Sequence, residues 1–555
     1  MFIDANELAD NAQLDCEICI IGAGPAGIVL ADGLGKMGLQ ICLTEAGGLL
    51  PQSDHAVPSV SEQLNHSIIV HPRTRYFGGM SNAWGGVRGL NVGFMPLDPI
   101  DFEKRPWVPN SGWPISYQEL KPFYERACSL VNELPSEDFD AQRHSDHLLA
   151  AFDDDVFRSC MTYLVRPIRF GKQYQEALGR AQNVRVLLNS YATEIEECRS
   201  EHGISLIHSF AKGGKKHRLS AGIFVLACGG LETTRLLLAS KRKHACGVGN
   251  QNDLVGRYYM QHPKGSHGHI ALRKNTKLKC YVPGLLLKDR LLKACISLTN
   301  QRQRREELLN HRVVLAPLLQ LSGSHAARRY GELRALWSER QCGKAFRMVA
   351  TSGAIGIPKV AASTCRNIIS SLSHGALHYR VINHMEQLPE PSSRIELSRE
   401  TNRFGVPLLR TRWRIGDAEK KSLCRFHELL GQNLSRYKIG SLQSRLDPQM
   451  NSWPVLTSSS HDLGTTRMHS DPRYGVTDAN GGVHGLRNLY IIGGALFPTG
   501  GHANPTLTII ALALRMVAHL AVQARMTPRL VRPFHASVRK DLVGNGSKLP
   551  QPRER

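Results

Sequence analysis

The first strong pattern in the chain is an apolar run followed directly by closely spaced glycines. Residues 16–21 are Cys-Glu-Ile-Cys-Ile-Ile, and Gly22-Ala-Gly-Pro-Ala-Gly27 follows at once. This order predicts a strand, a tight turn and a helix over residues 28–37. A second apolar run, residues 39–44, predicts the next strand, and Glu45 stands at its end. The pattern therefore indicates a nucleotide-binding α/β unit at the start of the chain.

Each polar or flexible residue of this unit has a distinct task. Gly22 permits the turn, Gly24 lets the backbone approach a pyrophosphate, and Gly27 lets the helix pack closely on the strand. The carboxylate of Glu45 is placed to accept hydrogen bonds from ribose hydroxyls and would repel a ribose 2′-phosphate. FAD or NAD is therefore favoured over NADP. The alternative is a merely structural glycine turn, because one glycine motif is weak support in a chain with 50 glycines.

Further strand and helix patterns continue the α/β alternation. Residues 183–189 and 191–197 are typical of strands, and residues 222–227 predict a buried strand that runs into another glycine turn and helix. We interpret this strand as the return of the chain to the first sheet. Residues 488–492 predict a last strand, and the helix expected at 506–521 completes the nucleotide lobe.

The length of 555 residues is too great for one core, so two lobes are expected, discontinuous in sequence. We predict a nucleotide-binding domain over residues 1–266 with cap elements at about 90–170. A substrate-binding domain with a basic helical insert is expected over 267–454. Residues 455–525 would return to the first domain, and 526–555 would form a basic disordered tail.

The charge distribution is uneven. Lys and Arg total 70 against 47 Asp and Glu, a net charge of +23. Residues 281–380 alone contain 16 basic and 5 acidic side chains, and the insert at about 302–372 mixes basic with apolar positions at roughly helical spacing. A solvated basic face is favoured there, and peripheral contact with an anionic membrane surface is the alternative. Nucleic acid is not expected as a partner, because no zinc finger, RNP or helix-turn-helix pattern accompanies the charge.

Targeting and cysteine signals point to a cytoplasmic protein, peripheral to the inner face of a membrane if the insert docks there. No window approaches the roughly 18 uninterrupted apolar residues that span a bilayer, and the first 15 residues carry acids rather than the basic residues of a signal peptide. The 13 cysteines are scattered and suggest no disulfide framework. No metal site is expected, since Cys16 and Cys19 lie in a strand where residues three apart point to opposite faces.

The C-terminal part carries the candidate chemistry. His461-Asp-Leu-Gly-Thr-Thr-Arg-Met468 is followed by Gly500-Gly-His-Ala-Asn-Pro-Thr-Leu-Thr508, so that Asn504 comes 43 positions after His461. The short strand expected at 488–492 could bring the imidazole and the carboxamide to one place.

These segments together resemble the glucose-methanol-choline (GMC) family of flavin oxidoreductases. The resemblance covers nearly the whole chain, and it is most similar to the branch that contains pyranose oxidase and fructose dehydrogenase. Besides the N-terminal turn and the C-terminal pair, it rests on Gly78–Gly86, Trp107–Ile115, Asn252–Arg257 with His262-Pro263, and Glu386–Pro389. It implies a Rossmann-like FAD-binding domain, similar to that of p-hydroxybenzoate hydroxylase, with a discontinuous α+β substrate-binding domain.

The resemblance also implies an activity. An FAD-dependent dehydrogenase or oxidase would oxidise a CH–OH group of a sugar, polyol or other alcohol, and oxygen, a quinone or a cytochrome would receive the electrons. The basic insert is not expected in the simple sugar oxidases of this family. Their sugar substrate can therefore not be assigned directly to this chain. Two alternatives stay open: a hydroxynitrile lyase-like enzyme on the same scaffold, and a nonenzymatic flavoprotein, which the presence of both His461 and Asn504 disfavours.

In the resemblance, His461 matches the active-site histidine and Asn504 its partner. A neutral imidazole can take an alcohol's hydroxyl proton as the carbon-bound hydrogen leaves as hydride to flavin N5, and the amide can donate to the developing alkoxide. His502 does not align with the partner position and is expected to be a supporting loop histidine. His469 is expected at the surface.

The cofactor residues follow from the same matches. Ala83 stands where pyranose oxidase carries the histidine that attaches FAD, so a non-covalent FAD is expected. The resemblance implies that the FAD pyrophosphate faces Gly22, Gly24 and Gly27 and that the adenosine ribose meets Glu45. The loop with Gly79, Ser81 and Asn82 would lie over the pyrophosphate and the isoalloxazine, where Ser81 or Asn82 could bond flavin edge atoms. Gly494 and Ala495 would lie along the ribitol or the pyrophosphate, and Pro505 and Thr506 near the flavin ring.

Overall fold

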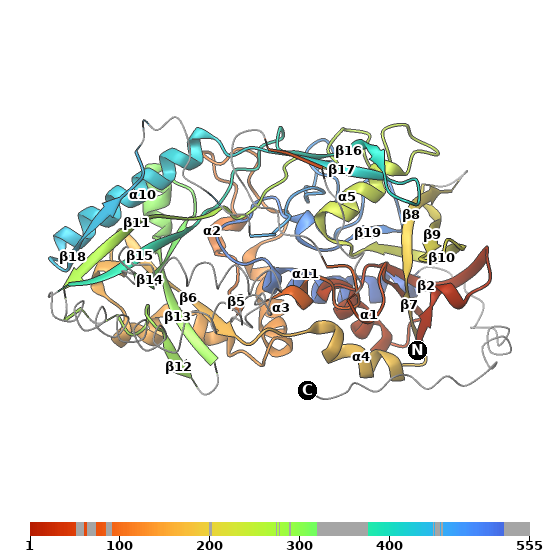
Figure 1. Cartoon of the computed structure of the whole chain (residues 1–555), viewed down its shortest axis with the longest axis horizontal. Coiled ribbons are helices and arrows are strands. Elements are labelled where there is room, and N and C mark those ends of the chain that lie inside the picture. Colours follow the sequence, from red (N-terminus) through yellow and green to blue (C-terminus); the bar gives the residue numbers. More distant parts are fainter. Residues whose placement is uncertain are drawn as a thin grey trace, which may run out of the picture.

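The computed structural model contains two large β-sheets with helices packed around them (Figure 1). It describes residues 1–51, 60–63, 74–84, 92–198, 202–273, 275–276, 278–287, 290–318, 376–447, 449, 456 and 459–526. Most of the predicted basic insert and almost all of the predicted tail lie outside these residues, so both remain predictions.

The first sheet has eight strands in the order β1-β7-β3-β2-β10-β9-β8, with β19 paired to β10. The pairs from β1 to β10, and the pair of β10 with β19, are parallel, whereas β8, β9 and β10 are antiparallel. This confirms that the strand near residue 226 returns beside the first one and that the last strand joins the same sheet. The strands are β1 (Phe2–Asp4), β2 (Ala12–Ile21), β3 (Ile41–Thr44), β7 (Val184–Leu188), β8 (Ser190–Glu197), β9 (Ile204–Ala211), β10 (Lys216–Leu226) and β19 (Leu489–Ile491).

Four helices accompany this sheet: α1 (Pro25–Lys36), α4 (Phe170–Arg180), α5 (Gly229–Ala239) and α11 (Thr506–Met526). The helix α1 begins three residues before its expected start, because Pro25 suits the first helical position, where no N–H is needed. The N-terminal α/β unit predicted from the sequence is present, and the α/β fold class with a Rossmann-like domain is confirmed.

The helix α11 is long and apolar enough to cross a membrane, with a mean hydropathy of 1.8 in the most apolar 18-residue window of residues 506–525. Its most apolar window is 61% buried inside the protein, and it packs against α1 and α3 (Tyr117–Leu130). It lies at the centre of the molecule in Figure 1. The burial therefore accounts for its hydropathy as that of a core helix.

The second sheet is antiparallel, in the order β18-β11-β15-β14-β13-β6-β5, with β12 paired to β13. Most of its strands lie at the opposite end of the molecule from β2, β9 and β10 (Figure 1). The strands are β5 (Val92–Phe94), β6 (Phe157–Val165), β11 (Lys264–Arg273), β12 (Leu285–Leu287), β13 (Arg290–Leu298), β14 (Arg312–Pro317), β15 (Ala376–His384) and β18 (Gly440–Ser444), and the helices near it are α6 (Asn300–Glu306) and α10 (Asp417–Arg436). The predicted domain boundaries stay a prediction, since strands from residues 92–165 also enter this sheet.

A three-stranded sheet completes the described fold, with β16 (Arg394–Thr401), β17 (Pro407–Trp413) and β4 (Val60–Gln63). It lies beside α5. The remaining elements are α2 (Pro99–Phe102) and short 3₁₀ segments at Ala5–Glu7, Gly79–Ala83, Ser136–Phe139, Ala141–His147, Ala150–Phe152 and Gly494–Leu496.

Candidate active site

A cavity of about 310 Å³ lies where the parallel strands of the first sheet end. Its walls include the last residues of β2 and β3, the loop after β10, and the first residues of α1 and α11. Carboxyl ends of parallel strands and amino ends of helices are where open α/β sheets bind nucleotides, because the helix N-termini favour negative charge.

Two of the three predicted N-terminal glycines border this cavity, and Gly27 does not. Gly22 and Gly24 line it, and a Cβ on Gly24 would meet no protein atom within 4 Å, so this backbone faces open space. A Cβ on Gly27 would come within 2.0 Å of the Gly22 carbonyl oxygen, which shows that Gly27 serves the close packing of turn and helix. Gly22 has φ +108°, a conformation that glycine adopts readily.

Glu45 lines the cavity and is buried, and its carboxylate is held by the turn. The backbone N–H groups of Ala23 and Gly47 donate to its two oxygens at 3.0 and 3.2 Å. Burial raises the pKa of Glu45 despite these hydrogen bonds. The carboxylate thus fastens β3 to the glycine turn at the position where a ribose hydroxyl is expected.

The loop after residue 78 meets the cavity at Gly79, but not at Ser81 or Asn82. The Ser81 hydroxyl donates to the Gly78 carbonyl at 2.7 Å, and the Asn82 amide donates to the Phe77 carbonyl at 3.0 Å. Both side chains therefore stabilise the turn and do not line the cavity. A Cβ on Gly79 would approach the Gly24 Cα to 2.9 Å, so the two glycine turns pack directly on each other.

The C-terminal segments complete the cavity wall. Gly494, Pro505 and Thr506 line it, whereas Ala495 is fully buried behind Gly494 and does not. Thr506 is the first residue of α11, so the amino end of the core helix opens onto the same cavity as the amino end of α1.

His461 also lines the cavity. Its Nδ1 is 2.8 Å from Nδ1 of His262, and Nε2 of His262 is 3.1 Å from the Gly500 carbonyl oxygen. The backbone N–H of His461 donates to Oε1 of Gln261 at 2.8 Å. His461 is therefore held from one side by residues 261 and 262.

Both histidines are neutral at ordinary pH. Burial, reinforced by His262, Lys264 and Arg312, holds the pKa of His461 well below its usual range. Burial likewise lowers the pKa of His262 to about 3. A neutral imidazole has one ring nitrogen free to accept a proton, which is the state that a general base requires.

Asn504 stands next to this region, although it is not among the residues that line the cavity. Its Nδ2 donates to the Gly93 carbonyl of β5 at 2.7 Å. One hydrogen of the Asn504 side-chain amide is thereby used in a bond to the second sheet. The second hydrogen of the same amide is not part of that bond. Asn504 immediately precedes the cavity-lining Pro505, and no hydrogen bond joins it to His461.

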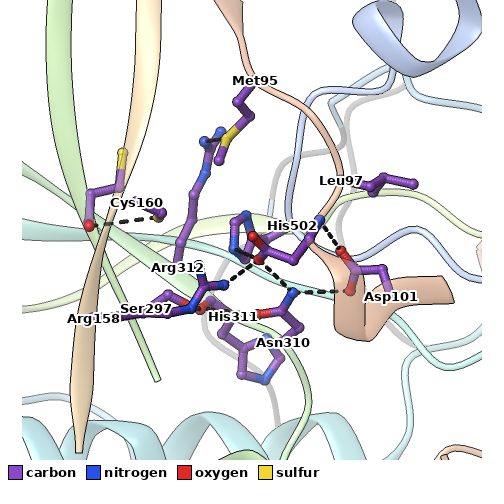
Figure 2. Close-up of polar contacts among 12 residues, drawn as sticks. Met95, Leu97, Asp101, Arg158, Cys160, Ser297, Asn310, His311, Arg312 and His502 are labelled. Atoms are coloured by element: carbon purple, nitrogen blue, oxygen red, sulfur yellow. Dashed lines mark hydrogen bonds and ion pairs between the residues drawn. The ribbon is translucent and has the colours of Figure 1, made fainter. Parts of the chain in front are cut away.

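His502 lies on the loop that carries Asn504, and it is buried in a polar cluster (Figure 2). Its Nε2 is 3.0 Å from Oδ2 of Asp98, which also forms an ion pair with Arg158. The Asn310 amide donates to Asp98 and to Asp101, each at 2.9 Å. The cluster ties the loop that carries Asn504 to α2 and the second sheet, as expected for a supporting histidine.

The two carboxylates of this cluster differ in charge. Burial alone would raise the pKa of Asp98, yet Arg158 and His502 together hold it well below its usual range. Burial, with the neighbouring charges of Glu386 and Asp98, raises the pKa of Asp101 to about 8. Asp98 is thus ionised at neutral pH, and Asp101 is largely protonated.

Sequence reasoning missed two groups. The first is a charged wall of the cavity, in which Glu232 pairs with Arg75 at 2.8 Å and with Arg235 at 2.9 Å, and both guanidinium groups stack on the Tyr191 ring at 5.1 and 4.9 Å. No motif marked these residues. The second is His262. The His262-Pro263 segment contributes to the resemblance to the GMC family, but it predicts no role for the histidine.

The residues that line the cavity suit FAD. They include Gly22, Glu45, His461 and Thr506, with open backbone at Gly24 for a pyrophosphate and the N-termini of α1 and α11. A long dinucleotide with negative charge in its middle matches this set of groups.

The geometry agrees with the comparisons to known proteins. Residues 389–513 match the family described as GMC oxidoreductase. The chain is 24% identical to the fructose dehydrogenase large subunit of Gluconobacter japonicus, over 91% of this chain and 97% of that protein. Residues 389–513 are therefore a GMC oxidoreductase C-terminal domain, and the similarity to FAD-dependent oxidoreductases of this kind extends over nearly the whole chain.

Other GMC-like relatives show the same extent of similarity. The 6'''-hydroxyparomomycin C oxidase of Streptomyces lividus is 23% identical, over 91% of this chain and 92% of that protein. Among solved structures, pyridoxine 4-oxidase from Mesorbium loti has a TM-score of 0.56 at 15% identity, covering 91% of this chain and 99% of that one. This likeness supports the fold. The GMC family and the likeness to the fructose dehydrogenase branch, both expected from the sequence, are confirmed.

Proposed function

We propose that this GMC oxidoreductase oxidises a CH–OH group of a sugar, polyol or other small alcohol, with His461 as the base that accepts the hydroxyl proton. The observation that carries the proposal is a neutral imidazole in the wall of the same cavity that the nucleotide-binding glycines open into. The relatives support the substrate class, since they are named for fructose, an aminoglycoside and 2-methyl-1,2-propanediol.

The chemistry divides between the protein and its cofactor. Bound FAD supplies a hydride acceptor at flavin N5. The protein removes the hydroxyl proton, because a hydride leaves a carbon more readily when the attached oxygen carries negative charge. Nε2 of His461 is the ring nitrogen available for this, since Nδ1 is engaged by His262.

Asn504 has the second role in the proposal. Its amide hydrogen that does not bond Gly93 would donate to the developing alkoxide, and the bond to Gly93 fixes the amide plane in advance. A donor fixed before the reaction stabilises charge at no cost of reorganisation.

The test is anaerobic flavin reduction, measured by loss of the flavin absorbance band against a panel of sugars, polyols and simple alcohols. With a reducing substrate in hand, His461→Ala should slow reduction by about 100-fold or more while FAD stays bound. His469→Ala is the control, because His469 lies outside the cavity wall, with its Nδ1 bonded to the Asp471 backbone. Near-normal reduction in His461→Ala would remove it from the role of base.

The same titration separates the remaining alternatives. Bleaching by one class of alcohol identifies the substrate class, and readmission of air shows whether oxygen, rather than a quinone or cytochrome, is the acceptor. Turnover of a cyanohydrin without bleaching would instead establish the lyase reaction.

We also propose that the FAD is bound non-covalently. Ala83 has no nucleophilic side chain at the position where a relative's histidine would attach the cofactor. Acid precipitation should release all the yellow colour into the supernatant. Flavin retained in the pellet would show a covalent bond.

We further propose a cytoplasmic enzyme, with the basic insert at about 302–372 as a solvated face or a peripheral membrane contact. Sedimentation with anionic liposomes distinguishes these: membrane docking predicts binding that falls with added salt. No binding at low salt would leave the solvated face.

A further inference from the structure

The contact between His262 and His461 determines which nitrogen of each ring carries a proton. A carbonyl oxygen only accepts hydrogen bonds, so Nε2 of His262 carries a hydrogen and donates it to the Gly500 carbonyl at 3.1 Å. A neutral imidazole has one N–H, which leaves Nδ1 of His262 bare and accepting.

His461 must then be the donor in the 2.8 Å contact between the two Nδ1 atoms. Its single hydrogen is on Nδ1, and its Nε2 has a free lone pair. Among the residues that the structure describes, none is recorded as a hydrogen-bond partner of this Nε2, and the residue lines the cavity. The hydrogen-bond chain therefore presents the basic nitrogen of His461 to the substrate space.

His262 is itself fixed in place. The segment before it pairs with the His461 loop through reciprocal backbone hydrogen bonds between Met260 and Leu463, at 3.1 and 3.0 Å. The Ser459 hydroxyl donates to the His262 carbonyl at 2.6 Å. His262 is 1% exposed, and its ring packs against Gly500. A Cβ added at Gly500 would lie 3.1 Å from Nε2 of His262.

We propose that His262 is a positioning residue of the reaction, which selects the Nδ1–H tautomer of His461 and orients its Nε2 toward the substrate hydroxyl. This inference rests on the proposed role of His461 as base. In the proton transfer, the O–H bond of the alcohol breaks and an N–H bond forms at Nε2 of His461. The Nδ1–H of His461 continues to donate to His262, which spreads the new positive charge, and no proton passes to His262.

Two substitutions of His262 test this on the FAD-loaded enzyme. His262→Leu removes the acceptor but keeps an apolar volume. His262→Asn keeps an acceptor, because the Asn Oδ1 falls near the place of the imidazole Nδ1. We expect flavin reduction to slow about 10- to 100-fold in His262→Leu, by analogy with the loss of hydrogen-bond partners of metal-binding histidines, and to recover to within about threefold of the natural enzyme in His262→Asn.

The pH dependence provides a readout that loss of structure would not produce. Without its acceptor, the protonated form of His461 loses stabilisation, so the acid limb of the reduction rate should move to lower pH as the plateau falls. Lys264, Arg312, His384 and His502 face the pair from β11, β14, β15 and the C-terminal loop. Burial lowers the pKa of Lys264 to about 8, so its charge stays unchanged over the acid side of the profile, below about pH 7.

The outcomes separate the two proposals. If His461→Ala is slow and His262→Leu is as fast as the natural enzyme, His262 does not position the base and the proposed function stands. If His262→Leu and His262→Asn are equally slow with an unmoved acid limb, the role of His262 is only structural. If His461→Ala itself is fast, the base assignment fails first. Flavin absorbance per protein, measured in each variant, shows that the cofactor is retained.

Discussion

The substitution Gly24→Ala isolates cofactor binding from folding. Gly24 has φ −78° and ψ −178°, which any residue adopts, and an added Cβ meets no protein atom within 4 Å. Alanine restricts the unfolded chain, worth about 0.4–1 kcal/mol of stability, but it is a poorer helix N-cap than glycine by a similar amount. The melting temperature of the FAD-free protein should therefore hardly change.

The effect on FAD should be large. The new methyl group would stand where a pyrophosphate oxygen approaches the backbone, so that at least one charge-assisted hydrogen bond is lost. Such a bond is worth about 1.5–3 kcal/mol, which corresponds to a rise in Kd of roughly 10- to 150-fold.

The assay titrates FAD-free protein with FAD and follows flavin fluorescence, with thermal unfolding by circular dichroism beside it. Gly27→Ala is the contrasting control: its Cβ would lie 2.0 Å from the Gly22 carbonyl oxygen, so it should lower both stability and affinity. A Kd for Gly24→Ala within twofold of the natural protein would refute the placement of the pyrophosphate against Gly24.

Three further predictions concern buried polar groups. Arg105 pairs with Glu386 through hydrogen bonds of 3.0 and 2.5 Å, and both side chains are at most 1% exposed. Arg105→Met would leave the Glu386 charge buried without its partner and should destabilise the protein by about 3–5 kcal/mol. Thermal unfolding should show a smaller loss of stability for the double variant Arg105→Met with Glu386→Gln than for Arg105→Met alone. The pKa of Asp101, about 8 in the folded protein and near 3.8 when unfolded, means that its contribution to stability is lost as pH rises between these values. Asp101→Asn should therefore narrow the drop in melting temperature from pH 5 to pH 8, and an unchanged drop would contradict this. The Tyr124 hydroxyl bonds the Thr508 hydroxyl at 2.8 Å, so Tyr124→Phe should cost about 1 kcal/mol in thermal unfolding without altering FAD affinity.

The nucleotide unit was predictable because its signals are local. Strand, glycine turn, helix and acid follow each other within residues 16–45, and each residue's role depends on its neighbours in sequence. The structure places Gly22, Gly24 and Glu45 in one cavity wall accordingly. The strand ending at Leu226 was likewise recognisable from its own apolar run.

The supporting contacts were not predictable, because they join distant segments. His262 and His461 are 199 positions apart, and Arg105 and Glu386 are 281 apart. No periodicity encodes such a contact; it depends on how two lobes pack. For the same reason, the sequence predicts that Ser81 and Asn82 lie in a loop. It does not predict that their side chains bond the backbone of that loop instead of lining the cavity.

The order in which the chain is synthesised has a consequence for how this cavity forms. Its lining residues fall within 21–46, 74–84, 190–192, 227–236, 459–463, 492–494 and 505–509, so the first part of the wall leaves the ribosome several hundred residues before the last. The strand β2 has a parallel partner in β10, but β19 and the amino end of α11 arrive only near residues 489–506. Contacts of such long sequence separation form slowly. FAD capture should therefore follow synthesis of the last part of this wall.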